Sequence, residues 1–417
     1  MENILLKDVI FSGEKKDILI SGDKIVKIGD VPAFTPAKIL DCKGEKAILP
    51  AFYNHHTHMA MSLMRGASDD YELFRWLNEV IWPAEKKLDR EAVYWGTRLA
   101  ILEMIHSGCV YFNDMYWCQM GAMKAIDDSG VRGCLGLLNL SHGGANDPRL
   151  DNGQLLEMSG ELGEMISLSL APHAVYTVSE EELKVLGEVS RKSDLAIHIH
   201  ASETAREVEE CRKEHKGLTP IAYLDELGLL HEKTFLAHAI HLTDADFEIV
   251  RRRRCILVHM PISNMKLASG AFRMDKAMEY SCRIALGTDG ASSNNNLSML
   301  EEMKFASLLA KHTSGNPELL KADEIFSIAT RNGAEFAGVD GGVIAEGKKA
   351  DCFLVNLKSP LLTPGHNLIS DLVYSADTSC IDTLFCNGKI LMENGVISGE
   401  EEVLEEAGKV AARLWKN

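Results

Sequence analysis

Between residues 47 and 340 the sequence alternates short apolar runs with stretches of helical periodicity. This alternation is typical of repeated β–α units, which build a parallel sheet. We find eight candidate strands, at Ala47–Phe52, Cys109–Phe112, Gly133–Leu138, Ser167–Ala171, Leu195–Ile199, Thr234–Ala237, Cys255–Val258 and Arg283–Leu286. Eight units within about 290 residues fit a (β/α)8 barrel, for which about 250 residues is typical. The sequence therefore predicts an α/β fold with a distorted TIM barrel.

The two ends of the chain show a different pattern, in which short strands are separated by turns. The candidate strands are Asn3–Ile10, Asp17–Ile20 and Lys24–Ile28 at the start, and Ala350–Leu357 and Cys380–Ile397 near the end. Because these segments flank the barrel, the simplest arrangement pairs them in one small β-sandwich. We predict a sandwich domain from residues 1–50 and 341–417, and a barrel domain from residues 51–340.

Charge and composition narrow the class of protein. The formal net charge of −17 argues against nucleic-acid partners, since such affinity comes mostly from Lys and Arg. We therefore interpret the basic run at 251–254 as a solvated helix end. The ten cysteines form no CxxC pair, which favours reduced thiols. The sequence begins without a signal-peptide pattern and contains no apolar run of about 20 residues, so we expect a cytoplasmic protein without a membrane segment.

A histidine cluster follows the first predicted barrel strand, in the segment Asn54–His58. In an extended chain, residues two apart point to the same side, so His56 and His58 can bind one metal ion while His55 faces away. A polar loop that is rich in histidine by chance is the alternative for this motif alone.

Ionisable residues also follow three later strands. His200 and Glu203 come at the end of the fifth, where His200 is a candidate ligand and Glu203 can transfer protons. We interpret His198 as a core histidine or as a support for the ligands. His238 follows the sixth strand and Asp289 follows the eighth. The alternative role for Asp289 is that of a helix N-cap. These side chains gather at the carboxyl ends of the strands, where barrel enzymes keep their active sites.

With these motifs in place, the sequence resembles the amidohydrolase superfamily over essentially its whole length. The resemblance runs from Leu49–His58 to Val343–Asp351, and the usual glycine after the proline is Ala51 here. It implies one divalent metal ion, zinc or iron with zinc preferred, and these ligands: His56, His58, His200 and Asp289. Relatives with two metals use a carboxylated lysine at the end of the fourth strand, but the segment Leu170–His173 contains none.

The resemblance also implies the reaction and the assembly. The reaction is hydrolytic removal of an amino group from a ring carbon. In it, Asp289 and His238 accept a proton and Glu203 passes one to the adjacent ring nitrogen. Barrels of this family often form dimers or tetramers, so we expect a homo-oligomer.

Several segments resemble the subgroup that deaminates 5′-methylthioadenosine, S-adenosylhomocysteine and related adenosines. They include Met61–Gly66 and Ile81–Glu85, both in a long connection that we interpret as a lid or binding loop. The implied substrate contacts are Trp76, Glu85, Arg149, His173 and Ser293. Glu85 would accept the ribose hydroxyls and Trp76 would line the purine pocket. Without the resemblance, Trp76 reads as a core residue and Glu85 as a solvated helix-start charge.

One departure concerns the 5′ group of the nucleoside. Leu137 stands where members that accept S-adenosylhomocysteine carry an arginine, so we expect apolar 5′ groups or adenosine itself. Deaminases of free guanine, cytosine or pterin, and s-triazine hydrolases, share the same ligand set and are the nearest alternatives. A catalytically inactive barrel that serves as an interaction protein is the alternative from another class.

Overall fold

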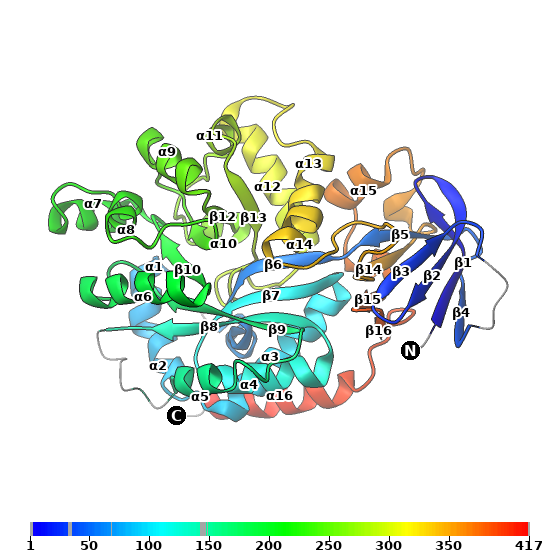
Figure 1. Cartoon of the computed structure of the whole chain (residues 1–417), viewed down its shortest axis with the longest axis horizontal. Coiled ribbons are helices and arrows are strands. Elements are labelled where there is room, and N and C mark those ends of the chain that lie inside the picture. Colours follow the sequence, from blue (N-terminus) through cyan, green and yellow to red (C-terminus); the bar gives the residue numbers. More distant parts are fainter. Residues whose placement is uncertain (1–2, 32–35, 68, 142–146, 148, 416–417) are drawn as a thin grey trace.

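The computed structural model describes residues 3–31, 36–67, 69–141, 147 and 149–415. Eight of its strands form one parallel sheet in the order β13-β12-β11-β10-β9-β8-β7-β6, which curves into a barrel (Figure 1). These strands are β6 Phe52–Thr57, β7 Cys109–Met115, β8 Arg132–Asn139, β9 Ile166–Pro172, β10 Ala196–Ala201, β11 Thr234–His238, β12 Ile256–His259 and β13 Arg283–Leu286. The predicted (β/α)8 barrel is confirmed.

The barrel closes where the last strand meets the first. The backbone N–H of Asp289 donates to the carbonyl of His56 at 2.9 Å, and Thr288 N–H donates to the Asn54 side chain at 3.1 Å. Gly287 permits this approach, because a Cβ at that position would lie 2.7 Å from the backbone nitrogen of His56. The closure places the segment after β13 directly beside the histidines of β6.

Helices follow the strands around the barrel. They are α3 Arg90–His106, α4 Gln119–Ser129, α5 Asn152–Glu157, α6 Glu180–Ser193, α7 Ala205–Glu214, α8 Pro220–Glu226, α9 Asp244–Arg253, α10 Pro261–Lys266, α11 Met274–Glu279, α12 Met299–Ser314, α13 Ala322–Ser327, η3 Ile328–Asn332 and α14 Gly333–Phe336. Several begin at hydroxyl caps, such as Thr204 for α7, whose side chain accepts the Glu207 N–H. Among the described helices, none is long and apolar enough to cross a membrane.

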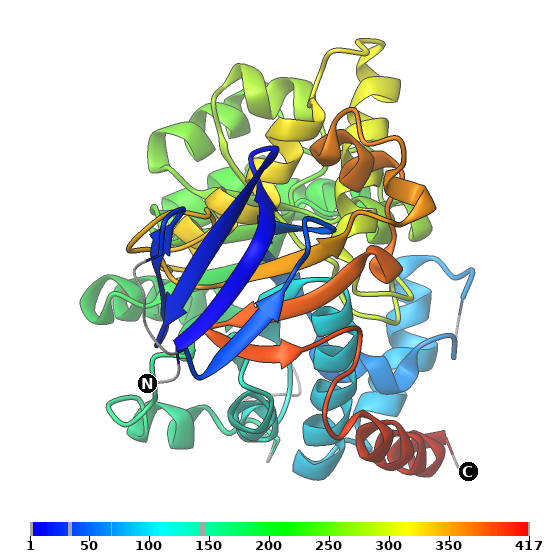
Figure 2. The same cartoon turned by 90° about the vertical axis from the view of Figure 1, so that its right-hand side faces the viewer.

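A second, mixed sheet combines strands from both ends of the chain, as predicted. Its order is β16-β15-β14-β5-β1-β2-β3, with β4 paired to β1. The strands are β1 Asn3–Phe11, β2 Glu14–Ser21, β3 Lys24–Ile28, β4 Lys38–Asp41, β5 Lys46–Pro50, β14 Cys352–Asn356, β15 Ile381–Cys386 and β16 Lys389–Met392. Figure 2 shows this sheet from the front, with the barrel behind it. The predicted domain boundaries at residues 50 and 341 stay a prediction.

The position of the first barrel strand differs from the prediction at Ala47–Phe52. In the structure, β5 ends at Pro50 and pairs with β14 of the second sheet, and the barrel strand β6 begins at Phe52. One apolar run thus serves two sheets in succession. The correction extends the barrel strand to Thr57, so His56 lies within it.

A buried ion pair joins the two sheets at the amino-terminal ends of the barrel strands. Arg132 at the start of β8 contacts Asp351 at 3.0 Å, and Tyr53 of β6 donates its hydroxyl to the same carboxylate at 3.1 Å. Buried charges are tolerated when they are paired and hydrogen-bonded in this way. The second sheet therefore supports the barrel from the end opposite to the residues discussed below.

Two further segments complete the fold. The connection after β6 forms four short helical pieces, η1 Met59–Met64, α1 Leu73–Trp76, η2 Leu77–Ile81 and α2 Trp82–Glu85. Towards the carboxyl end lie η4 Pro360–Leu362, α15 Leu368–Tyr374, η5 Thr378–Cys380 and α16 Glu400–Trp415. The last helix packs against α3, with Val403 and Val410 on its buried face.

Candidate metal centre and active-site cavity

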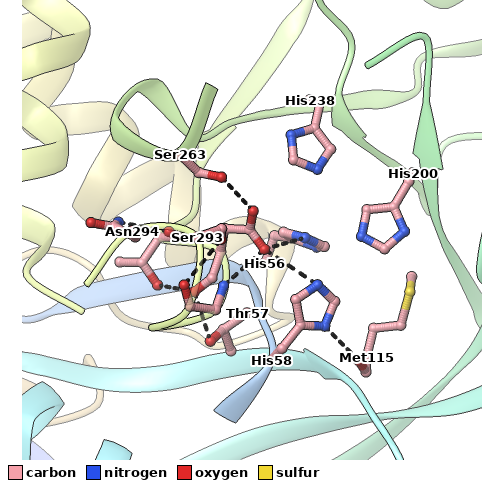
Figure 3. A network of polar contacts seen from close by, with 12 residues as sticks. His56, Thr57, His58, Met115, His200, His238, Ser263, Ser293 and Asn294 are labelled. Atoms are coloured by element: carbon pink, nitrogen blue, oxygen red, sulfur yellow. Dashed lines mark hydrogen bonds and ion pairs between the residues drawn. The ribbon is translucent and has the colours of Figure 1, made fainter. Parts of the chain in front are cut away.

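Three histidines from two barrel strands meet at the carboxyl-terminal rim. His56 lies in β6, His58 follows directly after it, and His200 lies in β10. One ring nitrogen from each can be chosen so that all three lie within 4.8 Å of one another. Figure 3 shows the three rings turned toward one space, with His238 beside them. The structure thus brings together three of the four predicted ligands.

Each of these rings is held through one nitrogen, which leaves the other for the shared space. Nδ1 of His58 donates to the carbonyl of Met115 at 2.6 Å, and Nδ1 of His200 donates to the carbonyl of His173 at 2.8 Å. Nδ1 of His56 lies 2.7 Å from Nε2 of His198. Such supports fix the orientation and tautomer of metal-binding histidines.

Asp289, the fourth predicted ligand, faces the histidines through one oxygen. Its Oδ1 lies 3.5 Å from Nε2 of His56 and 3.3 Å from Nε2 of His58. Its Oδ2 accepts a hydrogen bond from the hydroxyl of Ser263 at 2.6 Å. The residue has a positive φ of 64°, which the tight turn after β13 imposes. Oδ2 is therefore bonded to Ser263, while Oδ1, which accepts from the Gly290 N–H at 2.8 Å, faces the histidine cluster.

His238 and Glu203 lie next to each other at the edge of this cluster. Nε2 of His238 is 3.7 Å from Oε2 of Glu203, and the other oxygen of Glu203 accepts from the Ser269 hydroxyl at 3.3 Å. Both side chains are buried. Their positions at the ends of β11 and β10 are those expected from the sequence.

Burial lowers the pKa of His56 to about 4 and the pKa of His200 well below its ordinary value, so both rings are neutral near pH 7. At His58 burial acts in the same direction, but the hydrogen bond and charge of Asp289 outweigh it and raise the pKa to about 9. Burial raises the pKa of the Glu203 carboxyl. Neutral imidazoles are the form that binds metal ions, and a carboxyl with a raised pKa is suited to donate a proton.

A cavity of about 510 Å³ opens above the cluster. The lid segment forms one side of it through Trp76, Ile81 and Glu85, and His173 and Ser293 line other parts. All the residues that the sequence suggested for substrate contact are therefore brought to one cavity, which also contains Glu203, His238 and Asp289. The individual roles of these residues stay predictions.

Glu85 is buried. The alternative interpretation, in which it is a solvated charge at the start of a helix, is therefore wrong. Its carboxylate accepts a hydrogen bond from Nε1 of Trp117 at 3.3 Å. Burial raises its pKa, while the side chains of Tyr116 and Trp117 act in the opposite direction. Glu85 is one of the residues that line the cavity.

Arg149 reaches the cavity but its charge is already paired. The guanidinium contacts Asp147 at 2.6 Å and 2.9 Å, and its Cζ lies 4.0 Å from the centre of the Trp117 ring. It also donates to the backbone carbonyl of Glu85. Arg149 thus contacts both Glu85 and Trp117.

Several cavity residues were not found from the sequence. Tyr116 and Trp117 follow β7 and form the wall beside Glu85. Leu138 and Leu140 line the cavity near the end of β8, whereas Leu137 is buried and is not one of the described lining residues. Aromatic residues directly after a barrel strand were the available signal for the first two.

A barrel with a histidine and carboxylate cluster at its carboxyl-terminal rim defines a metal-dependent hydrolase scaffold. The sequence profile of the amidohydrolase family matches residues 47–391. This chain belongs to the amidohydrolase family.

Known proteins similar to this chain are named as nucleoside deaminases. A 5-methylthioadenosine/S-adenosylhomocysteine deaminase of Archaeoglobus fulgidus is 42% identical over 95% of both chains. A 5′-deoxyadenosine deaminase of Methanocaldococcus jannaschii is 41% identical over 97% of this chain and 98% of its own. The crystal structure of an adenosine deaminase from Xanthomonas campestris with bound zinc superposes with a TM-score of 0.91 at 29% identity, covering 99% of this chain and 98% of the other.

Proposed function

We propose that this chain is a metal-dependent hydrolase that deaminates adenine nucleosides to the inosine analogues and ammonia. The candidate substrates are 5′-deoxyadenosine, 5′-methylthioadenosine and adenosine. The observation that carries the proposal is one cavity in which Glu203, His238 and Asp289 share space with the buried carboxylate of Glu85. The names of the relatives that are about 40% identical over nearly the full chain support the same substrate class.

The donor set fits a divalent metal ion. Nε2 of His56 is buried and has no hydrogen-bond partner, although a buried polar atom normally has one. His56, His58, His200 and Asp289 would hold the ion, and we propose one zinc ion per chain. When bound, a divalent cation of this kind lowers the pKa of a water molecule from 15.7 towards about 7 and so supplies a nucleophile at neutral pH.

The surrounding residues move the protons. His238 has its Nδ1 occupied by the side chain of Asn264 at 2.8 Å, which leaves Nε2 as a proton acceptor that faces the cavity. Asp289 offers a second acceptor oxygen on the same side. Glu203, whose pKa burial raises, is the residue that we propose to pass a proton to the ring nitrogen next to the amine-bearing carbon.

We assign the binding of the ribose to Glu85. Glu85 presents a carboxylate whose two oxygens can accept the hydrogens of a vicinal diol, and Trp117 holds one of those oxygens in place. The apolar and aromatic wall that includes Trp76 and Met115 suits a purine ring. Glu203 and Glu85 would thus mark the base end and the sugar end of one substrate.

The surroundings of the 5′ group favour an apolar substituent. Leu138 and Leu140 contribute apolar surface to the cavity that Glu85 also lines. The Arg149 guanidinium is paired with Asp147, so it is not an unpaired cation that awaits a carboxylate. We therefore propose that methylthio and deoxy groups are accepted in preference to the amino-acid tail of S-adenosylhomocysteine.

The test is ammonia release, followed with the ultraviolet change of the purine. The panel contains 5′-methylthioadenosine, 5′-deoxyadenosine, adenosine, S-adenosylhomocysteine, guanine, cytosine and a pterin. Turnover of the first three that is lost in Glu203→Gln supports the proposal. Turnover restricted to the free bases would contradict it.

A second variant separates nucleosides from free bases. Glu85→Gln replaces one acceptor oxygen by an amide N–H₂ group, so it should lower kcat/KM for the nucleosides by at least about tenfold, the loss expected for one charged hydrogen bond of about 1.5–3 kcal/mol. A free base has no diol and its turnover should change little. A homo-oligomeric state and a cytoplasmic location stay predictions.

A further inference from the structure

The short helix α10 brings two neighbouring polar residues to the site. It begins at Pro261, directly after β12, and its third and fourth residues are Ser263 and Asn264. Ser263 donates its hydroxyl to Oδ2 of Asp289 at 2.6 Å, and Oδ1 of Asn264 lies 2.8 Å from Nδ1 of His238. Both side chains are buried, and they hold the two groups that the proposed reaction uses as proton acceptors.

The contact with Asn264 decides which nitrogen of His238 is free. An amide oxygen can only accept hydrogen bonds, so Nδ1 of His238 must carry the proton. Nε2 then has its lone pair available, and it is Nε2 that lies 3.7 Å from Oε2 of Glu203. Without this partner the neutral ring could exchange its two tautomers, and in one of them Nε2 could not accept a proton.

The contact with Ser263 decides which oxygen of Asp289 faces the histidines. The hydroxyl engages Oδ2, and the N–H of Gly290 adds a hydrogen bond to Oδ1 at 2.8 Å. Oδ1 is the atom that lies 3.3 Å from Nε2 of His58. The carboxylate plane is therefore fixed from two sides, with one oxygen directed into the cluster.

The helix itself is tied to the turn that carries Asp289. Glu302 of α12 is completely buried, accepts from the Asn294 side chain at 2.6 Å, and accepts from the Ile262 N–H at 3.4 Å. Asn294 also donates to the carbonyl of Thr288 at 2.7 Å. Because of these bonds, α10 and the turn after β13 are held as one unit.

These interactions are costly for the fold. Asparagine is an unfavourable residue in the interior of a helix. In addition, Nδ2 of Asn264 is buried with no hydrogen-bond partner. A buried unsatisfied donor costs about 1–3 kcal/mol. A helix that served packing alone would gain from an apolar residue here, so the site retains Asn264 for its contact with His238.

We propose that Ser263 and Asn264 are a pair of positioning residues that set the orientation of Asp289 and the tautomer of His238, respectively. The inference deepens the proposed function and rests on it for the assignment of the two acceptors. It predicts separate effects, because the ligand set that we propose contains Asp289 and not His238.

The experiment compares Ser263→Ala, Asn264→Ala and Asn264→Asp with the wild type. Met265→Ala, which changes an exposed residue of the same helix, is the matched control. Three quantities are measured: zinc affinity by competition with a chelator, kcat and KM for the best nucleoside of the panel, and the ¹⁵N NMR shifts of the His238 ring, assigned by comparison with His238→Gln.

The expected results differ between the two positions. Ser263→Ala weakens zinc binding by about 10–100-fold, the usual effect of losing a hydrogen bond to a ligand. Asn264→Ala keeps full zinc content and a similar KM but lowers kcat by at least about tenfold, because a positioned base typically contributes 10²–10⁴-fold. Asn264→Asp keeps the acceptor oxygen and retains most of kcat. The ring shifts report the Nδ1–H tautomer in the wild type and a mixture in Asn264→Ala.

Any of three results would overturn the inference. The first is that Ser263→Ala binds zinc as the Met265→Ala control does. The second is that His238 keeps one tautomer in Asn264→Ala. The third is that Asn264→Asp loses as much kcat as Asn264→Ala does. If the wild type deaminates no nucleoside, the proposed function fails, and the zinc and NMR measurements still decide the positioning roles.

Discussion

The carboxylate of Glu207 accepts a hydrogen bond from the backbone N–H of Glu203 at 2.7 Å, and its other oxygen accepts from the N–H of Ser202 at 2.9 Å. Ser202 has a positive φ of 54°, an unfavourable conformation for a residue other than glycine. One buried side chain from the first turn of α7 thus stabilises the bend after β10. That bend directs the Glu203 side chain toward His238.

Glu207→Gln should therefore impair the step that uses Glu203. The amide keeps one acceptor oxygen but turns an N–H₂ group toward the second backbone donor, which leaves a buried N–H unsatisfied at a cost of about 1–3 kcal/mol. We expect kcat to fall about tenfold or more while KM changes little. Steady-state kinetics check this, with the exposed Glu209→Gln as the control on the same helix. A fall in kcat of the same size in both variants would contradict a specific role.

His198→Ala should weaken metal binding. Nε2 of His198 lies 2.7 Å from Nδ1 of His56, and the ring is completely buried beneath the cluster. Loss of such a partner typically costs 10–100-fold in metal affinity. Chelator competition measures the effect. The control is His231→Ala. His231 hydrogen-bonds Ser190 and lies just before the start of β11, at the end of that strand opposite to His238. Equal zinc affinity in both variants would assign His198 to packing alone.

Trp117→Phe should raise KM for nucleosides. The substitution keeps an aromatic ring under Arg149 but removes the N–H that donates to Glu85 at 3.3 Å. Hydrogen bonds to charged groups contribute about 1.5–3 kcal/mol, so we expect KM to rise by about tenfold with kcat little changed. Trp95→Phe, in α3, is the matched control. A fall in kcat at constant KM would place Trp117 at the base end of the substrate instead.

The sequence predicted best what depends on local periodicity. Alternation along a strand predicted that His56 and His58 lie on one side. Because barrel sites lie at the carboxyl ends of the strands, the same site was predicted to include His200, His238 and Asp289. The start of the first barrel strand was predicted wrongly. The apolar run from Ala47 to Phe52 is continuous, and periodicity alone does not reveal that the chain leaves one sheet and enters another at Ala51.

Contacts between distant segments could not be predicted. Glu207 stands in a charged helical stretch that is typical of a solvated face. Its carboxylate is nevertheless buried, because it bonds the bend that follows β10. Asn264 is 26 residues from His238, and its helix follows a different strand. Asn264 also follows the carboxyl end of a barrel strand, so the same positional rule could have indicated it.

The buried position of Glu207 also predicts how stability depends on pH. Burial raises the pKa of its carboxyl from 4.5 to about 7. A carboxyl with a raised pKa in the folded state stabilises the fold below its unfolded pKa, and this contribution is lost as the pH rises through the folded pKa. Relative to Glu207→Gln, which does not titrate, the wild type should therefore lose stability between about pH 4.5 and pH 7 and change little above pH 8. Thermal unfolding of both proteins with saturating zinc over this range measures the difference, in which effects of pH on the other groups cancel. Parallel curves would mean that the carboxylate stays ionised throughout, with the two backbone N–H groups offsetting its burial. Under the same conditions Glu209→Gln should run parallel to the wild type, because Glu209 lies on the surface beside Lys213.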